Sequence, residues 1–173
     1  KDAGGVRRSV PPPPPPPDQK VDVVGTYCAT DPTEAIFPVK VLFILDDSGS
    51  MLSSDVNFGR VAAARTLIDQ LYDQSPAIYF GIERFSHTVE VLTEPTFTRE
   101  RGNGPGQIEW ALDTGRYRSD GCTLYQAALD LGTESIMADM AANPQWASRT
   151  HYVVIFLSDG EPRVGWNCDP ENP

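Results

Sequence analysis

Residues 41–51 read VLFILDDSGSM, and this stretch decides which fold the chain can adopt. An apolar run stops at a carboxylate, Asp46, and two hydroxyl residues, Ser48 and Ser50, follow with a glycine between them. Such a pattern brings oxygen ligands to the carboxyl edge of a buried sheet. Mg²⁺ binds oxygens and needs only one or two carboxylates, because it keeps several waters in a near-octahedral shell. The stretch therefore predicts a metal site at the end of a buried strand.

The composition of the chain argues against several classes of function. The 173 residues are 40% hydrophobic and 22% charged, which suits one globular domain with an extension. The formal net charge of −10 argues against nucleic-acid binding, which needs clustered Lys and Arg. No apolar run reaches the about 20 residues that span a bilayer. Because the sequence begins at Lys1 without a signal-like segment, we expect a processed or trimmed product.

The chain divides into three segments of different composition. Residues 1–20 contain seven consecutive prolines at 11–17, which favour an extended polyproline II rod that cannot join a packed core. We interpret this segment as a flexible stalk, with a docking motif for a proline-recognising module as the alternative. Residues 21–36 form a lead-in, and residues 37–173 are predicted to be the folded domain.

Apolar strands alternate with amphipathic helices in the folded part. Residues 39–45 are almost continuously apolar, which is typical of a strand covered on both faces. Ser86 and His87 separate two strand-like runs and favour a hairpin. The strands are expected at 39–45, 77–85, 88–92 and 151–157, and the helices at 55–72, at 107–112 and from 124 to Asn143-Pro144. This alternation predicts an α/β, doubly wound and mostly parallel sheet with helices on both faces, whose ligands bind outside the carboxyl ends of the strands.

Two further polar loops belong at the same edge of the predicted sheet. Asp159 stands two residues after the last apolar strand, within the motif LSDG at residues 157–160. The loop SDGCT, residues 119–123, leads into the long helix and ends at Thr123. We therefore expect both loops to lie beside Asp46.

Taken together, the three loops resemble those of a von Willebrand factor type A domain, where they form the metal-ion-dependent adhesion site. The resemblance covers residues 37 to about 162, and the motifs occur in the order of the family. It implies that Mg²⁺, Ca²⁺ or Mn²⁺ is coordinated by five residues. The hydroxyls of Ser48, Ser50 and Thr123 would bind it directly, and the carboxylates of Asp46 and Asp159 directly or through water.

The resemblance also implies how a partner is bound. Neutral hydroxyl ligands leave the cation with residual positive charge and an open position, which an acidic residue of a partner protein can fill. Asp47, Asp120 and Gly121 lie in the site loops and are candidate partner contacts, although the two acids could simply be solvated. We expect partner specificity in residues 94–120, which are glycine-rich and carry several arginines.

The resemblance predicts more chain than is present. A complete domain of this type would continue with further helix and strand units, yet only residues 160–173 follow Asp159. We therefore expect a domain that is truncated after its fourth strand and incomplete on its C-terminal side.

The three cysteines indicate in which cellular compartment the protein works. Cys28 and Cys168 flank the domain and are candidates for a clasp or for pairing with an absent segment, because connectivity cannot be deduced from sequence. A soft thiolate suits Mg²⁺ badly, so packing or a disulfide is expected for Cys122. Possible disulfides and the proline-rich segment favour an extracytoplasmic protein, secreted or on the cell surface. It would be anchored through the stalk or an absent region. A lipid-anchored bacterial protein would also fit.

Binding is favoured over catalysis. In a haloacid-dehalogenase-like phosphotransferase Asp46 would be the nucleophile, but Ser48 stands where the general acid is needed. His87 and His151, the two histidines, are expected far from the carboxyl edge, which argues against a triad. We therefore predict a non-enzymatic, cation-dependent adhesion module. The alternative is a structural subunit of a surface assembly whose metal stabilises the fold.

Overall fold

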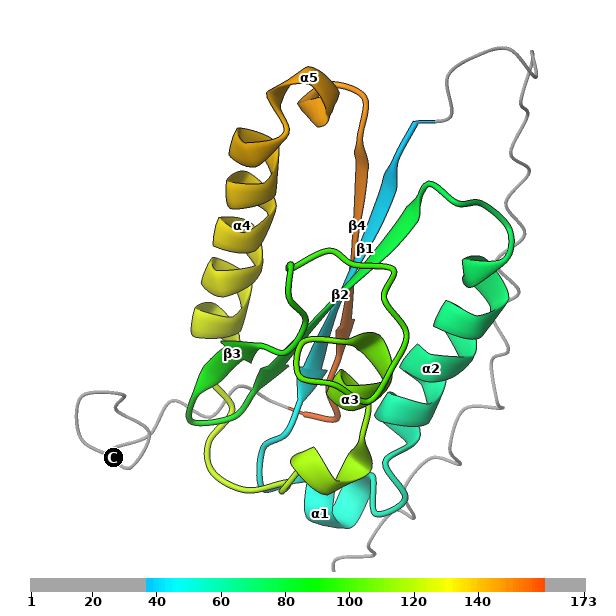
Figure 1. Cartoon of the computed structure of the whole chain (residues 1–173). Helices are drawn as coiled ribbons and strands as arrows, with labels where there is room; N and C mark the ends of the chain where they lie inside the picture. The colour runs from blue at the N-terminus through cyan, green and yellow to red at the C-terminus, as the bar shows by residue number, and fades with distance from the viewer. Residues whose placement is uncertain (1–36, 161–173) are drawn as a thin grey trace, which may run out of the picture. The chain divides into compact units, whose positions relative to one another are not determined.

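A central strand with parallel neighbours on both sides organises the protein, whose computed structural model describes residues 37–160 (Figure 1). Strand β1 (Val39–Asp46) pairs in parallel with β2 (Ile78–Phe85) and with β4 (His151–Leu157). The short β3 (Val89–Val91) pairs antiparallel with β2, so the strand order is β3-β2-β1-β4. This mostly parallel sheet confirms the fold class predicted from the sequence. The predicted stalk and lead-in lie outside the described residues.

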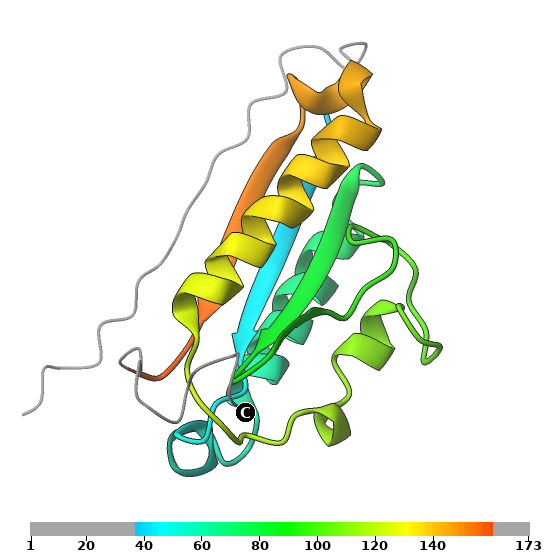
Figure 2. The same cartoon turned by 90° about the vertical axis from the view of Figure 1, so that its left-hand side faces the viewer.

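Two long helices cover opposite faces of the sheet (Figures 1 and 2). Helix α2 (Gly59–Tyr72) shares a buried cluster with Val41, Phe43 and Leu45, whereas α4 (Tyr125–Ala142) shares one with Leu42 and Ile44. Successive side chains of a strand point to opposite faces, so every apolar residue of β1 has a helix to pack against. This is why the run 41–45 is continuously apolar rather than alternating.

The remaining elements are short. They are α1 (Met51–Ser54), α3 (Ile108–Ala111), the 3₁₀ helix η1 (Thr114–Arg116) and α5 (Pro144–Ala147). None of the helices in residues 37–160 has the length and apolar character needed to cross a membrane. The segment that carries α3 and η1 packs against the face of the sheet that α2 covers, through Ile108 and Leu112.

Strand β4 forms one edge of the described sheet. Val153 and Val154 are 43% and 46% exposed. Because neighbouring residues of a strand point to opposite faces, both faces of β4 are open among the described residues. The face that β4 turns toward α4 is covered at both ends of the strand, where Tyr152 packs against Phe97 and Phe156 packs against Phe85 and Tyr125, but not at Val154 between them.

Candidate metal centre

The end of β1 fixes Asp46 in a single position. Its side chain is fully buried, and its Oδ1 accepts a hydrogen bond from the amide of Ser48 at 2.8 Å. Its Oδ2 accepts a bond from the hydroxyl of Ser158 at 2.6 Å. The parallel register sets Leu45 opposite Leu157, which brings the residues that follow both strands to the same edge. Asp46 is therefore held by one bond from its own loop and one from the end of β4.

A chain of oxygen atoms continues from this carboxylate to the surface. Ser48 is fully buried, and its Oγ lies 3.2 Å from the Oγ of Ser50. Ser50 donates in turn to Oδ1 of Asp159 at 2.9 Å. The structure thus brings together four of the five residues predicted as metal ligands, from the loops after β1 and β4.

Backbone hydrogen bonds hold the third loop against the first. The amide of Gly49 donates to the carbonyl oxygen of Gly121 at 3.1 Å, and the amide of Asp120 donates to that of Asp47 at 3.0 Å. Thr123, two residues beyond Gly121, is 4% exposed. Its hydroxyl has no hydrogen-bond partner within residues 37–160. A hydroxyl without such a bond, on a residue that is itself mostly buried, is suited to serve as a ligand.

Gly121 cannot be replaced without moving its surroundings. Its φ of +77° is in the left-handed region, and a Cβ there would lie 2.3 Å from Nδ1 of His87. His87 therefore lies beside the site loop, and the expectation that it is far from the carboxyl edge is wrong. The reason is that β2 runs parallel to β1, so the turn after β2 reaches the same edge. His151 pairs with Val39 at the opposite end, as expected.

The donor set fits a hard cation. It contains two carboxylates and three hydroxyls, all oxygen ligands. No group of three or more His, Cys, Asp or Glu side chains that could hold a metal occurs in the described part of the chain. The oxygen donor set suits Mg²⁺, which usually keeps several waters and binds to one or two protein carboxylates.

Asp47 is buried, which differs from the prediction. The sequence indicated a solvated acid or a partner contact, but the residue is only 3% exposed. Its carboxylate accepts bonds from Arg60 Nη2 at 3.0 Å and from the amides of Arg118 and Ser119 at 3.0 and 2.8 Å. These charge-assisted bonds tie the loop at 118–119 to the end of β1. Asp120 and Gly121, the other candidate partner contacts, are exposed.

The sequence did not predict several residues of this site. Arg60 is 6% exposed and pairs with both Asp47 and Asp55, an arrangement that only the tertiary structure creates. Ser54 donates to Oδ2 of Asp159, and the hydroxyl of Tyr125 contacts that of Ser158. Ser158 could have been found, because it stands next to Asp159 in a loop already singled out.

Cys122, in the same loop as Thr123, is disulfide-bonded. This agrees with the expectation of packing or a disulfide for this thiol. The predicted clasp between Cys28 and Cys168 concerns residues outside the described part of the chain.

Comparisons with known proteins agree with the fold. Residues 41–161 match the family described as von Willebrand factor type A domain. Relatives named UPF0353 protein in Mycobacterium tuberculosis and Mycobacterium avium are 27% and 28% identical over 135 residues, or 77% of this chain. The chain spans 37% of the length of these relatives.

Two solved structures share the fold at low sequence identity. The von Willebrand factor domain of the type V pili tip protein Mfa5 from Porphyromonas gingivalis is 17% identical, with a TM-score of 0.53. The match covers 73% of this chain and 39% of that one. The pilus adhesin SpaC from Lactobacillus rhamnosus GG is 23% identical, with a TM-score of 0.50 over 73% of this chain and 16% of SpaC.

Proposed function

The chain belongs to the von Willebrand factor type A domain family, and from this premise we propose that it is a non-enzymatic protein-binding module that works through a divalent cation. A carboxylate of the partner protein would complete the coordination of that cation. The observation that supports the proposal is the continuous chain of oxygens from Ser48 through Ser50 to Asp159, beside the buried Asp46.

Five side chains would hold the cation, preferably Mg²⁺, with Ca²⁺ or Mn²⁺ as alternatives. The hydroxyls of Ser48, Ser50 and Thr123 would bind it directly, and Asp46 and Asp159 would bind it directly or through water. When bound, the cation supplies a positive centre that attracts a carboxylate. The protein's own contribution is to fix the loop that carries the hydroxyls, through the bond from the amide of Ser48 to the buried Asp46 and through the contact between Gly49 and Gly121.

The setting we propose is a surface assembly outside the cytoplasm. Two similar structures come from a pilus tip protein and a pilus adhesin, and the disulfide at Cys122 is typical of an oxidising compartment. Anchoring through residues 1–20 or through a region not present in this chain belongs to the same proposal. The role as a whole is adhesion through a protein partner, with no catalytic step.

Calorimetric titration of Mg²⁺ tests the proposal. Asp46→Asn is expected to weaken Mg²⁺ binding at least about tenfold, because a direct or water-linked carboxylate loses its charge. Asp73→Asn removes one charge from an exposed site at the end of α2 and should leave Mg²⁺ binding unchanged. Equal Mg²⁺ affinity in both variants would contradict the proposed site.

Two further measurements separate the alternatives. If chelation leaves the melting temperature unchanged, the cation serves binding; if chelation unfolds the chain, the cation is a structural element of an assembly subunit. Hydrolysis of p-nitrophenyl phosphate that disappears in Asp46→Asn would instead establish a phosphotransferase-like enzyme. We expect no hydrolysis with either protein.

A further inference from the structure

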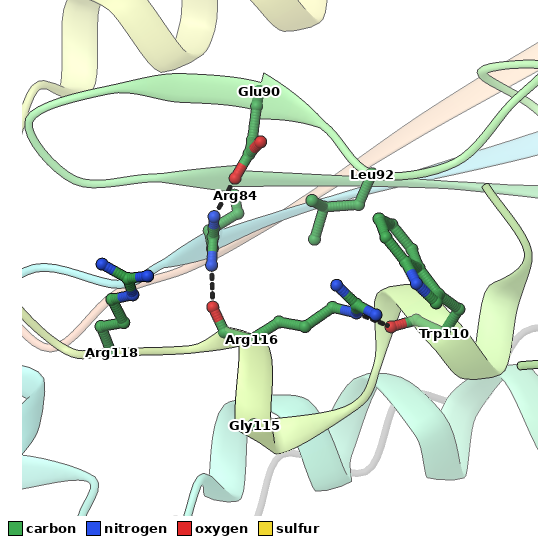
Figure 3. A pocket seen from close by; sticks show the side chains of 7 residues that line it. All are labelled: Arg84, Glu90, Leu92, Trp110, Gly115, Arg116 and Arg118. Atoms are coloured by element: carbon green, nitrogen blue, oxygen red, sulfur yellow. Dashed lines mark hydrogen bonds and ion pairs between the residues drawn. The ribbon is translucent and has the colours of Figure 1, made fainter. Parts of the chain in front are cut away.

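A pocket lined by arginines lies between the β2–β3 hairpin and the segment around η1 (Figure 3). Its volume is about 260 Å³. The residues that line it are Arg84, Glu90, Leu92, Trp110, Gly115, Arg116 and Arg118. The set has three positive side chains and one negative, in a chain whose net charge is −10. The charge of this pocket is therefore opposite in sign to that of the chain as a whole.

Two of the three arginines are already positioned by the protein. Arg84 pairs with Glu90 and donates to the carbonyl oxygen of Arg116. Arg116 donates through Nε to the carbonyl oxygen of Trp110 at 2.9 Å, and its guanidinium lies 3.6 Å from the centre of the indole ring. Stacking on an aromatic face holds a guanidinium in place while its edge stays available to a carboxylate.

The third arginine has no such partner. Arg118 is exposed, and its guanidinium makes no hydrogen bond or ion pair within residues 37–160. Figure 3 shows it apart from the bonded pair of Arg84 and Arg116. The backbone of Arg118 is nevertheless fixed, because its amide donates to Oδ2 of Asp47. A fixed backbone that carries an unpaired guanidinium is suited to bind a negatively charged group of a partner molecule.

Asp47 links the pocket to the candidate metal centre. Its carboxylate lies 3.7 Å from Nη1 of Arg84, and it directly follows Asp46 in the sequence. The loop that begins at Arg118 ends at Thr123. Arg118 at the pocket and Thr123 at the metal centre are five positions apart, so their Cα atoms lie within about 18 Å of each other. An extended partner segment of about five residues could reach both.

We propose that this pocket binds a second acidic side chain of the same partner segment whose first acidic residue reaches the cation. The proposal rests on the proposed function and specifies its partner: an extended, acidic peptide segment with two carboxylates about five residues apart. Guanidinium groups bind carboxylates through paired hydrogen bonds. Leu92 and Trp110 add an apolar wall against which the stem of a glutamate can pack.

Fluorescence anisotropy with short synthetic peptides in excess Mg²⁺ tests the proposal on the full chain. The probe is a labelled glycine-serine peptide with an aspartate near one end and a glutamate five residues further on. A second peptide has glutamine in place of the glutamate, and a third has asparagine in place of the aspartate. We expect the two-acid peptide to bind about tenfold more tightly than the glutamine peptide, as one charge-assisted contact allows.

Arg118→Glu should remove this preference and leave calorimetric Mg²⁺ binding unchanged. Arg149→Glu makes the same charge change at an exposed position before β4, at the amino end of the sheet, and should keep the preference. Equal affinity of wild type for the two-acid and glutamine peptides would overturn the inference. So would an Arg118→Glu variant that retains the preference, or inorganic sulfate that competes as well as the peptide does.

A metal-free measurement keeps the two proposals separable. In the presence of chelator, the asparagine peptide is expected to shift the side-chain NMR signals of Arg118 and Arg116. If these signals shift while Mg²⁺ fails to bind, the proposed function is wrong and the proposal that the arginine pocket binds a carboxylate stands. If Mg²⁺ binds and these signals do not shift at any peptide concentration, the proposal for the arginine pocket is wrong and the proposed function stands.

Discussion

Glu83 is a buried acid between β2 and α4. It is 1% exposed, and its Oε1 accepts a bond from the hydroxyl of Ser135 at 2.7 Å. Its Oε2 has no hydrogen-bond partner within the described part of the chain. Burial raises the pKa of Glu83 to about 7, although the bond from Ser135 acts in the opposite direction. Glu83 therefore stays protonated to a higher pH in the folded protein than in the unfolded chain.

This raised pKa makes the stability of the fold depend on pH. An acid whose pKa is higher in the folded state than in the unfolded state costs stability as pH rises from about 4.5 to about 7 and above. The full cost is on the order of 3 kcal/mol. Glu83→Gln removes it, so we expect the variant to gain about 3 kcal/mol relative to wild type between pH 4.5 and pH 8.

Urea unfolding at acidic and at mildly alkaline pH measures this difference. Glu134→Gln, an exposed acid next to Ser135 on α4, is the matched control and should show no such pH dependence. If the stability of Glu83→Gln relative to wild type is the same at both pH values, the pKa of Glu83 is not raised in the folded state.

The sequence predicted the positions of the acidic residues better than it predicted their hydrogen-bond partners. Asp46 and Asp159 are found at the carboxyl edge because Asp46 ends β1 and Asp159 stands two residues beyond the end of β4. Asp47 has the same neighbours in sequence, yet its carboxylate turns toward Arg60, thirteen positions away along the chain. No local pattern distinguishes the two orientations, because the guanidinium that binds Asp47 belongs to Arg60 in helix α2, outside the loop.

The start of helix α2 also differs from the one that the sequence predicted. The sequence predicted a helix over residues 55–72, whereas α2 begins at Gly59 and Phe58 before it has a φ of +54°. The apolar spacing that indicated the helix is correct, and Val61, Ala64 and Ile68 are buried against the sheet. What the periodicity could not show is that Asp55 lies outside the helix. It accepts hydrogen bonds from the amides of Gly59 and Arg60 at 2.5 and 3.2 Å.

Asp55 is therefore expected to stabilise the start of α2. Burial acts to raise the pKa of Asp55, but the bonds from Arg60 and Gly59 prevail and lower it. Asp55→Ala removes the acceptor for two free amides of the first turn and one partner of Arg60. Loss of such a cap typically costs about 1–2 kcal/mol. We expect that loss in urea unfolding at neutral pH, and a smaller one at acidic pH, where Asp55 is protonated.

Asp73→Ala provides the comparison at the other end of the same helix. Asp73 is the C-terminal capping position, where an acid gains nothing from the helix dipole. Its replacement should leave the free energy of unfolding nearly unchanged. If both variants lose the same stability, Asp55 acts through net charge and not as a cap.

For the whole molecule, the alternation of strands and helices was enough to predict the mostly parallel sheet and the covering of both faces. The loops after β1 and β4 meet because the ends of parallel strands coincide, whereas backbone hydrogen bonds hold the loop before α4 against the first of them. The pairing of the hairpin also followed from the sequence. Side-chain networks such as that around Asp47, and the pocket of arginines, did not, since they join residues with no shared local pattern.

The exposed edge of β4 has a consequence for the behaviour of the chain in solution. Val153 and Val154 leave apolar surface beside backbone groups that no described strand pairs with. Apolar, unpaired edge strands promote association with other strands, and a lysine at such an edge opposes it. We expect this chain to self-associate with increasing concentration in light scattering, and Val154→Lys to reduce that association. Val56→Lys, in a loop at 63% exposure, should leave it unchanged. A wild-type chain that stays monomeric at every concentration would mean that the edge of β4 is protected.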